Sequence, residues 1–174
     1  ISADNRYKLF INGEYIANDP ARGDNLNWRF ETIDLAKYLK PGKNVLAAVV
    51  WNFGIFRPMA QHTAGTGLIV QGNAEQQSHF NTDKSWKVAL NSAYSPRPVQ
   101  LRTYAYYVVG PGENVNYQEF LNDWSSVEYN DSLWQNAAEG PQGMPLKAHH
   151  QYGDISSRIL VPRTIPMMEE TDQR

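Results

Sequence analysis

An alternating segment that ends in Asn-Gly, close to the start of the chain, limits what this sequence can fold into. Apolar residues occupy every second position of residues 6–11, which is the pattern of a β-strand with one buried face. Asn12-Gly13 follows, and both residues tolerate the positive φ angles of a type I′ turn. The sequence therefore predicts a β-hairpin whose second strand starts at Glu14. The side chains expected on the buried face are Tyr7, Leu9 and Ile11.

Short strand patterns continue along the chain, whereas long segments of helical period are missing. Residues 44–51 (NVLAAVVW) are apolar on both faces, so they predict a central strand that is covered on both sides. Asp34 and Pro41-Gly42 mark the start and end of one short helical turn. Aromatic residues make up 12% of the chain, which favours β-structure. Further strands are expected at residues 28–33, 68–71, 86–90, 99–109 and 158–161.

These patterns together predict an all-β fold, an antiparallel β-sandwich with one or two short helical turns. Two loops separate its strands. Residues 18–27 consist almost entirely of loop formers and charges and are expected on the surface. Residues 52–67 form a longer loop without a clear period, and a loop of this length in a compact domain is either functional or disordered.

Charge and composition exclude several classes of function. The chain of 174 residues carries 16 basic and 18 acidic side chains, a net charge of −2, which provides no basic surface for nucleic acid. It has no cysteine, which excludes disulfides and thiolate zinc sites. The longest apolar run, residues 45–51, is far shorter than the roughly twenty residues that cross a membrane. We expect no nucleic-acid partner, no membrane partner and no targeting segment in this sequence.

The sequence lacks the common motifs of serine hydrolases, zinc peptidases and P-loop enzymes. An acidic cluster remains, and a glycosidase needs two carboxyl groups about 5 to 9.5 Å apart. Asp131 is better explained as the cap of a turn that carries Leu133 and Trp134, and the other carboxylates as solvated loop residues. We therefore predict no catalytic residue and no cofactor, with hydrolysis through Glu128 or Asp131 as the alternative. The cluster consists of Glu119, Asp123, Glu128 and Asp131.

Two groups of potential metal ligands occur in the sequence. His149-His150 are adjacent, and adjacent side chains of an extended segment point to opposite faces. Asp19, Asp24 and Asn25 offer oxygen ligands, but they lack a spaced ligand series with a bidentate glutamate. The sequence therefore predicts no metal site.

Aromatic faces that stack on sugar rings, next to planar polar groups, are the signature of carbohydrate recognition. The long loop after residue 51 could bring such groups to one end of a sandwich. Packing is the competing explanation, because Trp51 is expected in the core and Trp28 could attach a loop to the sheet. The candidate sugar-binding residues are Trp28, Phe56, Arg57 and His62, with Tyr104 and Tyr106 as a second group.

Several blocks of the sequence resemble a known protein family. YKLFINGEYI (7–16) and WRFETIDLAKYLKPGKNVLAAVVW (28–51) are similar to the jelly-roll, galactose-binding-like domains that accompany the catalytic domains of large glycoside hydrolases. TDKSWKV (82–88), NDWSSVEYNDSLWQNA (122–137) and LVPRTIPMMEE (160–170) narrow the resemblance to the N-terminal region of bacterial α-L-rhamnosidases. That resemblance implies a non-catalytic accessory domain beside an (α/α)₆ catalytic barrel of the same polypeptide.

The resemblance also sets expectations about organisation and role. We expect a jelly-roll sandwich over residues 1–110 without its first strand or strands, and a segment over 111–174 that completes the sheets or begins a neighbouring sandwich. From about residue 164 the chain reads as a linker-like tail. The expected partners are the catalytic barrel and rhamnose-containing glycans, in the bacterial periplasm or outside the cell. A free-standing carbohydrate-binding module and an accessory domain of a β-galactosidase-like hydrolase are the alternatives.

Overall fold

The structure, a computed structural model, describes residues 1–97, 110–140, 144–145 and 158–171. The expected strand at 99–109, both Tyr104 and Tyr106, and His149-His150 lie outside these residues. The strands are β1 (Ser2–Asp4), β2 (Arg6–Ile11), β3 (Glu14–Asp19), β4 (Trp28–Phe30), β5 (Leu46–Trp51), β6 (Gly67–Ile69), β7 (Lys87–Val88), β8 (Tyr94–Arg97), β9 (Gly112–Val115), β10 (Gln135–Asn136), β11 (Met144–Pro145) and β12 (Ile159–Pro162). Short 3-10 helices are η1 (Ala36–Tyr38), η2 (Gly54–Phe56), η3 (Glu75–Phe80) and η4 (Tyr117–Glu119).

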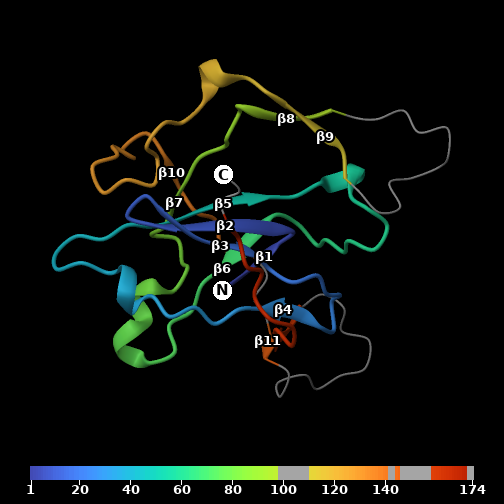
Figure 1. The fold of residues 1–174 in the computed structure, drawn as a ribbon, viewed down its shortest axis with the longest axis horizontal. Coiled ribbons are helices and arrows are strands. Elements are labelled where there is room, and N and C mark those ends of the chain that lie inside the picture. Colours follow the sequence, from blue (N-terminus) through green and yellow to red (C-terminus); the bar gives the residue numbers. More distant parts are fainter. Residues whose placement is uncertain (98–109, 141–143, 146–157, 172–174) are drawn as a thin grey trace.

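The predicted hairpin forms the middle of the molecule (Figure 1). β2 and β3 pair in antiparallel fashion, and the turn residues Asn12 and Gly13 have φ angles of 52° and 84°. The alternation of β2 is confirmed, because Tyr7, Leu9 and Ile11 are all buried. β3 continues to Asp19, which is buried, so the prediction that a surface loop begins at residue 18 is wrong at its start.

The apolar segment at residues 44–51 forms β5, but it is not the central strand that its sequence predicts. The order of the sheet is β3-β2-β5, so within the described residues β2 is central and β5 lies at the edge. All six residues of β5 are half-buried. One face, with Leu46 and Val50, packs on the core, and partial cover on both faces explains why the segment lacks a polar side.

A second layer packs against this sheet and closes the core between them. β1 pairs with β6, and Ala3 from β1 packs in the same cluster as Tyr7, Leu9 and Ala17 of the central sheet. The partly buried side chains around that cluster are Ile1, Ile16, Ile33, Leu46, Ala48, Val50 and Leu68. The predicted all-β sandwich is confirmed, and its helical turns number four in the described part of the chain.

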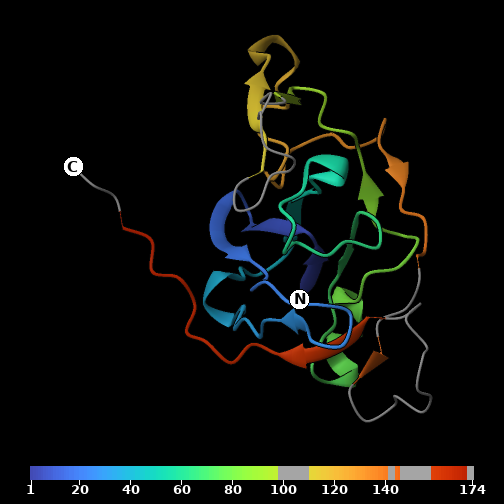
Figure 2. The same ribbon diagram turned by 90° about the vertical axis from the view of Figure 1, so that its right-hand side faces the viewer.

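One sheet departs from the antiparallel expectation. β12 lies between β11 and β4 and is parallel to both, with Leu160 opposite Trp28. The Ile159 amide donates to the Asn25 carbonyl (2.8 Å) and the Arg163 amide to the Phe30 carbonyl (3.0 Å), which extends the pairing at each end. After β12 the chain leaves its sheet (Figure 2), but it still contacts β3, where the Tyr15 hydroxyl donates to Glu170 (2.6 Å).

Candidate functional site

The long loop at residues 52–67 is attached to a buried carboxylate in the first strand. Asp4 is 2% exposed, and its two carboxylate oxygens accept four hydrogen bonds. Ala64 donates its amide (2.7 Å) and Arg158 its Nη2 (2.8 Å) to Oδ2, while Asn5 (2.7 Å) and Asn52 (3.0 Å) donate to Oδ1. A carboxylate saturated in this way holds the loop in place and offers no free oxygen for chemistry.

Two asparagines next to Asp4 fix the rest of the loop. Asn5 accepts from the Phe53 amide (3.1 Å) and donates to the His62 carbonyl (3.1 Å), so it holds both ends of the segment. Asn52 donates to Thr63 Oγ1 (2.7 Å). The sequence predicted a functional loop here, and the structure gives it a rigid base of amide groups.

The predicted sugar-binding residues differ in their exposure to solvent. Arg57 and His62 have exposed side chains on the loop, and Phe56 is half-buried in η2. Arg57 donates to the Gly54 carbonyl of its own turn (3.1 Å). Trp28 is 5% exposed, with its indole nitrogen bonded to the Ala3 carbonyl and the Arg158 guanidinium 4.9 Å from its ring. Trp28 therefore packs between strands and presents no open ring face to a sugar.

A second buried group of charges joins the C-terminal segment to the sandwich. Arg163 forms ion pairs with Asp19 and Glu31, whose side chains are at most 4% exposed. Glu31 also accepts from the Ala21 amide (3.0 Å) and the Tyr7 hydroxyl (3.3 Å). No local pattern marks this group, because its members come from four distant segments.

Burial sets the protonation behaviour of that group. Desolvation raises the pKa of both Asp19 and Glu31 above the usual range, although Arg163 opposes the shift. Burial and the neighbouring Glu31 carboxylate also raise the pKa of the Tyr7 phenol. A carboxylate with a raised pKa can act as a general acid, but both of these are sealed from solvent and bonded to Arg163.

All four residues of the acidic cluster considered for catalysis are exposed: Glu119, Asp123, Glu128 and Asp131. Glu119 accepts from Asn116 Nδ2 (3.0 Å). The predicted turn at Asp131 is present, since the Trp134 amide donates to the Asp131 carbonyl (2.9 Å). The side chain that accepts an amide hydrogen bond there is Asn130, from Ser132 (3.1 Å), and not Asp131 as predicted. Asp34 does accept from the Ala36 amide (3.0 Å), as expected for the turn at η1.

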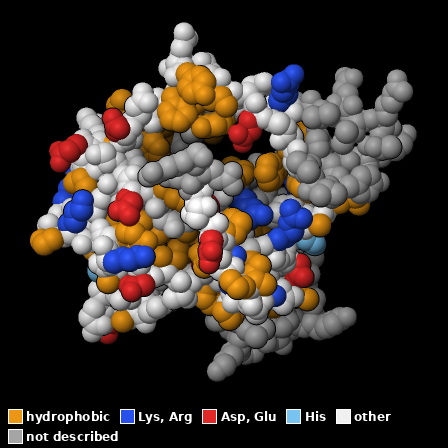
Figure 3. Space-filling model, viewed as in Figure 1, with side chains coloured by type: hydrophobic (Ala, Val, Ile, Leu, Met, Phe, Trp, Pro, Cys, Tyr) orange, Lys and Arg blue, Asp and Glu red, His pale blue; other side chains and the backbone are white. Residues whose placement is uncertain are grey.

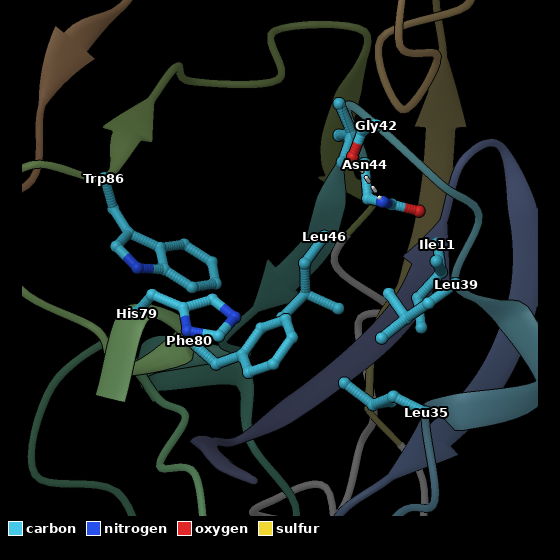
Figure 4. A pocket seen from close by; sticks show the side chains of 10 residues that line it. Ile11, Leu35, Leu39, Gly42, Asn44, Leu46, His79, Phe80 and Trp86 are labelled. Carbon is cyan, nitrogen blue, oxygen red and sulfur yellow. Dashed lines mark hydrogen bonds between the residues drawn. The ribbon is translucent and has the colours of Figure 1, made fainter. Parts of the chain in front are cut away.

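A pocket of about 420 Å³, lined mostly by apolar side chains together with Asn44 and His79, opens between η1, η3 and the sheet (Figure 4). Leu35 and Leu39 line one side, Phe80 and Trp86 line the other, and Leu46 lies between them. The polar groups of Asn44 are occupied, because its amide oxygen and nitrogen bond to Asn12 and to the loop at 40–42. No sequence pattern predicted this pocket, although most of its lining residues lie in the blocks at 7–16, 28–51 and 82–88 that carry the family resemblance.

The potential metal ligands serve other purposes. Asp19 pairs with Arg163, and Asp24 Oδ1 accepts from the Leu26 and Asn27 amides to close a turn. The residues that the structure describes contain no cluster of three or more His, Cys, Asp or Glu side chains that could hold a metal ion. They also contain no helix long and apolar enough to cross a membrane.

Comparison with known proteins gives one informative match. The chain is similar to a crystal structure of a GH78 family rhamnosidase of Bacillus sp. GL1, with a TM-score of 0.66 and 28% sequence identity. The match covers 95% of this chain and 16% of the rhamnosidase chain. No protein-family model matches the chain, and no curated protein does. The resemblance predicted from sequence is confirmed: the chain resembles a domain of a rhamnosidase-type hydrolase, and spans about a sixth of that protein's length.

Proposed function

We propose that this chain is a non-catalytic β-sandwich domain of an α-L-rhamnosidase-type glycoside hydrolase, and that it supports the catalytic barrel of a longer polypeptide. The observation that carries the proposal is the match of nearly the whole chain to a small part of a rhamnosidase. As in the sequence analysis, we place the parent enzyme in the bacterial periplasm or outside the cell.

The chemistry of the buried carboxylates supports a structural role. Asp4 binds Arg158, and Asp19 and Glu31 bind Arg163, so each carboxylate neutralises a cation that connects distant segments. A retaining or inverting glycosidase instead needs two carboxyl groups that face a sugar. The three buried carboxylates are committed to holding the sandwich together.

The apolar pocket supports the scaffold role in a second way. Leu39, across the pocket from Phe80 and Trp86, is 38% exposed. Apolar side chains left open on a rigid body stabilise a contact when another domain covers them. In this proposal the pocket receives side chains of a neighbouring domain and fixes its orientation.

A hydrolysis assay tests the absence of catalysis. The purified chain is incubated with 4-nitrophenyl α-L-rhamnopyranoside, and we expect no release of 4-nitrophenol above the buffer rate. Release that disappears in Glu128→Gln or Asp131→Asn would overturn the proposal, because it would place a catalytic carboxylate in this domain.

A stability assay on the longer polypeptide tests the supporting role. We expect Leu39→Asp to lower the melting temperature of the rhamnosidase by several degrees while KM stays unchanged. Leu133→Asp is the control, because Leu133 is 94% exposed and does not line the pocket. Equal behaviour of the two variants would contradict a contact at the pocket.

A further inference from the structure

Three aromatic side chains gather on the hairpin of β8 and β9 and on the 3-10 helix that follows. Tyr94 lies opposite Val115 in the hairpin, and its ring centroid is 6.0 Å from that of Phe120. The rings of Tyr117 and Phe120 are 6.2 Å apart and nearly parallel, at 27°. We call Tyr94, Tyr117 and Phe120 the aromatic platform.

The platform is open to solvent. Tyr117 is 81% exposed, and Tyr94 and Phe120 are 42% and 37% exposed. Figure 3 shows hydrophobic side chains gathered at the top of the molecule, over the region where Figure 1 draws β8 and η4. Exposed aromatic rings that contact one another, away from the core, indicate a binding surface rather than packing.

The backbone beneath the platform is held in place before any ligand binds. The Asn116 amide donates to the carbonyl of Ala93 (2.8 Å), which is 1% exposed and anchors the hairpin to the body. The Asn116 side chain accepts from the Gln118 amide (3.1 Å) and donates to Glu119 (3.0 Å). A rigid set of rings loses little conformational entropy when a ligand stacks on it.

The polar groups around the rings favour a sugar over a protein surface as the ligand. Within the described residues, the hydroxyls of Tyr94 and Tyr117, the side-chain amide of Gln118 and the Oε2 of Glu119 have no hydrogen-bond partner. A protein that covered the platform would bury these groups, including a carboxylate, at a cost unless each found a partner. A pyranose offers an apolar face to the rings and hydroxyls to the groups around them.

We propose that the aromatic platform binds neutral glycans, with sugar rings stacked on Tyr117 and Phe120 and hydroxyls bonded to Gln118 and Glu119. The carboxylate of Glu119, which is bonded to Asn116 next to Tyr117, disfavours glycans that contain uronic acids, because like charges repel. The choice of rhamnose as the probe sugar rests on the proposed function.

To test the proposal, the chain is titrated with a neutral oligosaccharide of α-linked L-rhamnose, and the heat of binding is measured by isothermal titration calorimetry. We expect saturable binding that falls at least tenfold in Tyr117→Ala and stays within about threefold in Tyr117→Phe, since phenylalanine keeps the stacking face. Leu133→Ala, which changes an exposed apolar residue outside the platform, should bind as the unmodified chain does. Circular dichroism confirms that each variant is folded.

Several results would overturn this proposal. The first is the absence of saturable binding to the rhamnose oligosaccharide, or binding that Tyr117→Ala leaves unchanged. The second is tighter binding of an oligogalacturonide of the same length, which would contradict the role of Glu119. If glycans do not bind but Tyr117→Ala lowers the melting temperature of the longer polypeptide, the platform is an interdomain contact and the proposal fails. The proposed function is tested separately, because it is the release of 4-nitrophenol in the hydrolysis assay that would overturn it.

Discussion

Tyr7 and Tyr117 are both tyrosines of β-rich segments, yet the protein uses them in opposite ways. Tyr7 is fully buried in the central sheet, and its hydroxyl donates to Glu31. Tyr117 is 81% exposed beside the β8–β9 hairpin, with its ring against Phe120. In the body of the sandwich the tyrosine ring is buried and stabilises the fold. On the outer hairpin the tyrosine ring stays in solvent, where a ligand can reach it.

Truncation of the buried tyrosine should give the largest effect on stability. We expect Tyr7→Ala to lower the free energy of unfolding by about 4 kcal/mol, because it leaves a cavity in the core and removes the hydrogen bond to Glu31. Urea denaturation followed by fluorescence measures the change. A loss below about 1 kcal/mol would show that the two tyrosines are not distinguished by packing.

Removal of the buried guanidinium should come next. Arg163→Met leaves Asp19 and Glu31 buried without a cation, so we expect a loss of about 3 kcal/mol in the same denaturation experiment. Arg57→Met is the matched control, because Arg57 is exposed and, among the residues that the structure describes, bonds only to the backbone of its own turn. We expect the control to change stability by less than about 0.5 kcal/mol.

The buried carboxylate should also leave a signature in the pH dependence of stability. The pKa of Glu31 is raised by burial, so the folded state holds its proton at pH values where the unfolded state has lost it. From about pH 4.3, the usual pKa of glutamate, up to the raised value, the contribution of Glu31 to the free energy of unfolding therefore falls as pH rises. We expect Glu31→Gln to remove this decrease in the free energy of unfolding over the same interval. An unchanged slope in Glu31→Gln would show that Glu31 is not the titrating group.

Truncation of the exposed tyrosine should give the smallest effect. We expect Tyr117→Ala to change the free energy of unfolding by less than about 0.5 kcal/mol, because its ring is largely in water in the folded state. Thermal and urea denaturation both measure it. A loss near that of Tyr7→Ala would mean that the outer hairpin belongs to the core, and the contrast between the two regions would disappear.

Local patterns in the sequence predict the parts of the fold that form between near neighbours. The period of two in β2 and the Asn12-Gly13 turn fix the hairpin and its buried face, and both are as expected. The same reasoning predicts β5 at the centre of its sheet, whereas it lies at the edge of the described strands, because periodicity reports which faces are covered and not which strands lie alongside. The parallel pairing of β12 with β4 joins segments about 130 residues apart and has no local signal.

The candidate sites follow the same division. Arg57 and His62 were predicted from a loop of unusual length, and the structure does place both side chains at the surface. Trp28 carried the same aromatic signal but is buried under Arg158, a contact that depends on the return of β12. The platform residue Tyr117 was not singled out, because Tyr94 is brought next to Phe120 only through the pairing of β8 with β9.

The position of β12 between β4 and β11 has a consequence for synthesis on the ribosome. β2, β3 and β5 can pair as soon as residue 51 has emerged, whereas the strand edge of β4 must wait for residue 162. At typical rates of translation this interval lasts roughly ten seconds. During that time the nascent chain carries an open strand edge, which is where a chaperone would bind or a neighbouring nascent chain would pair.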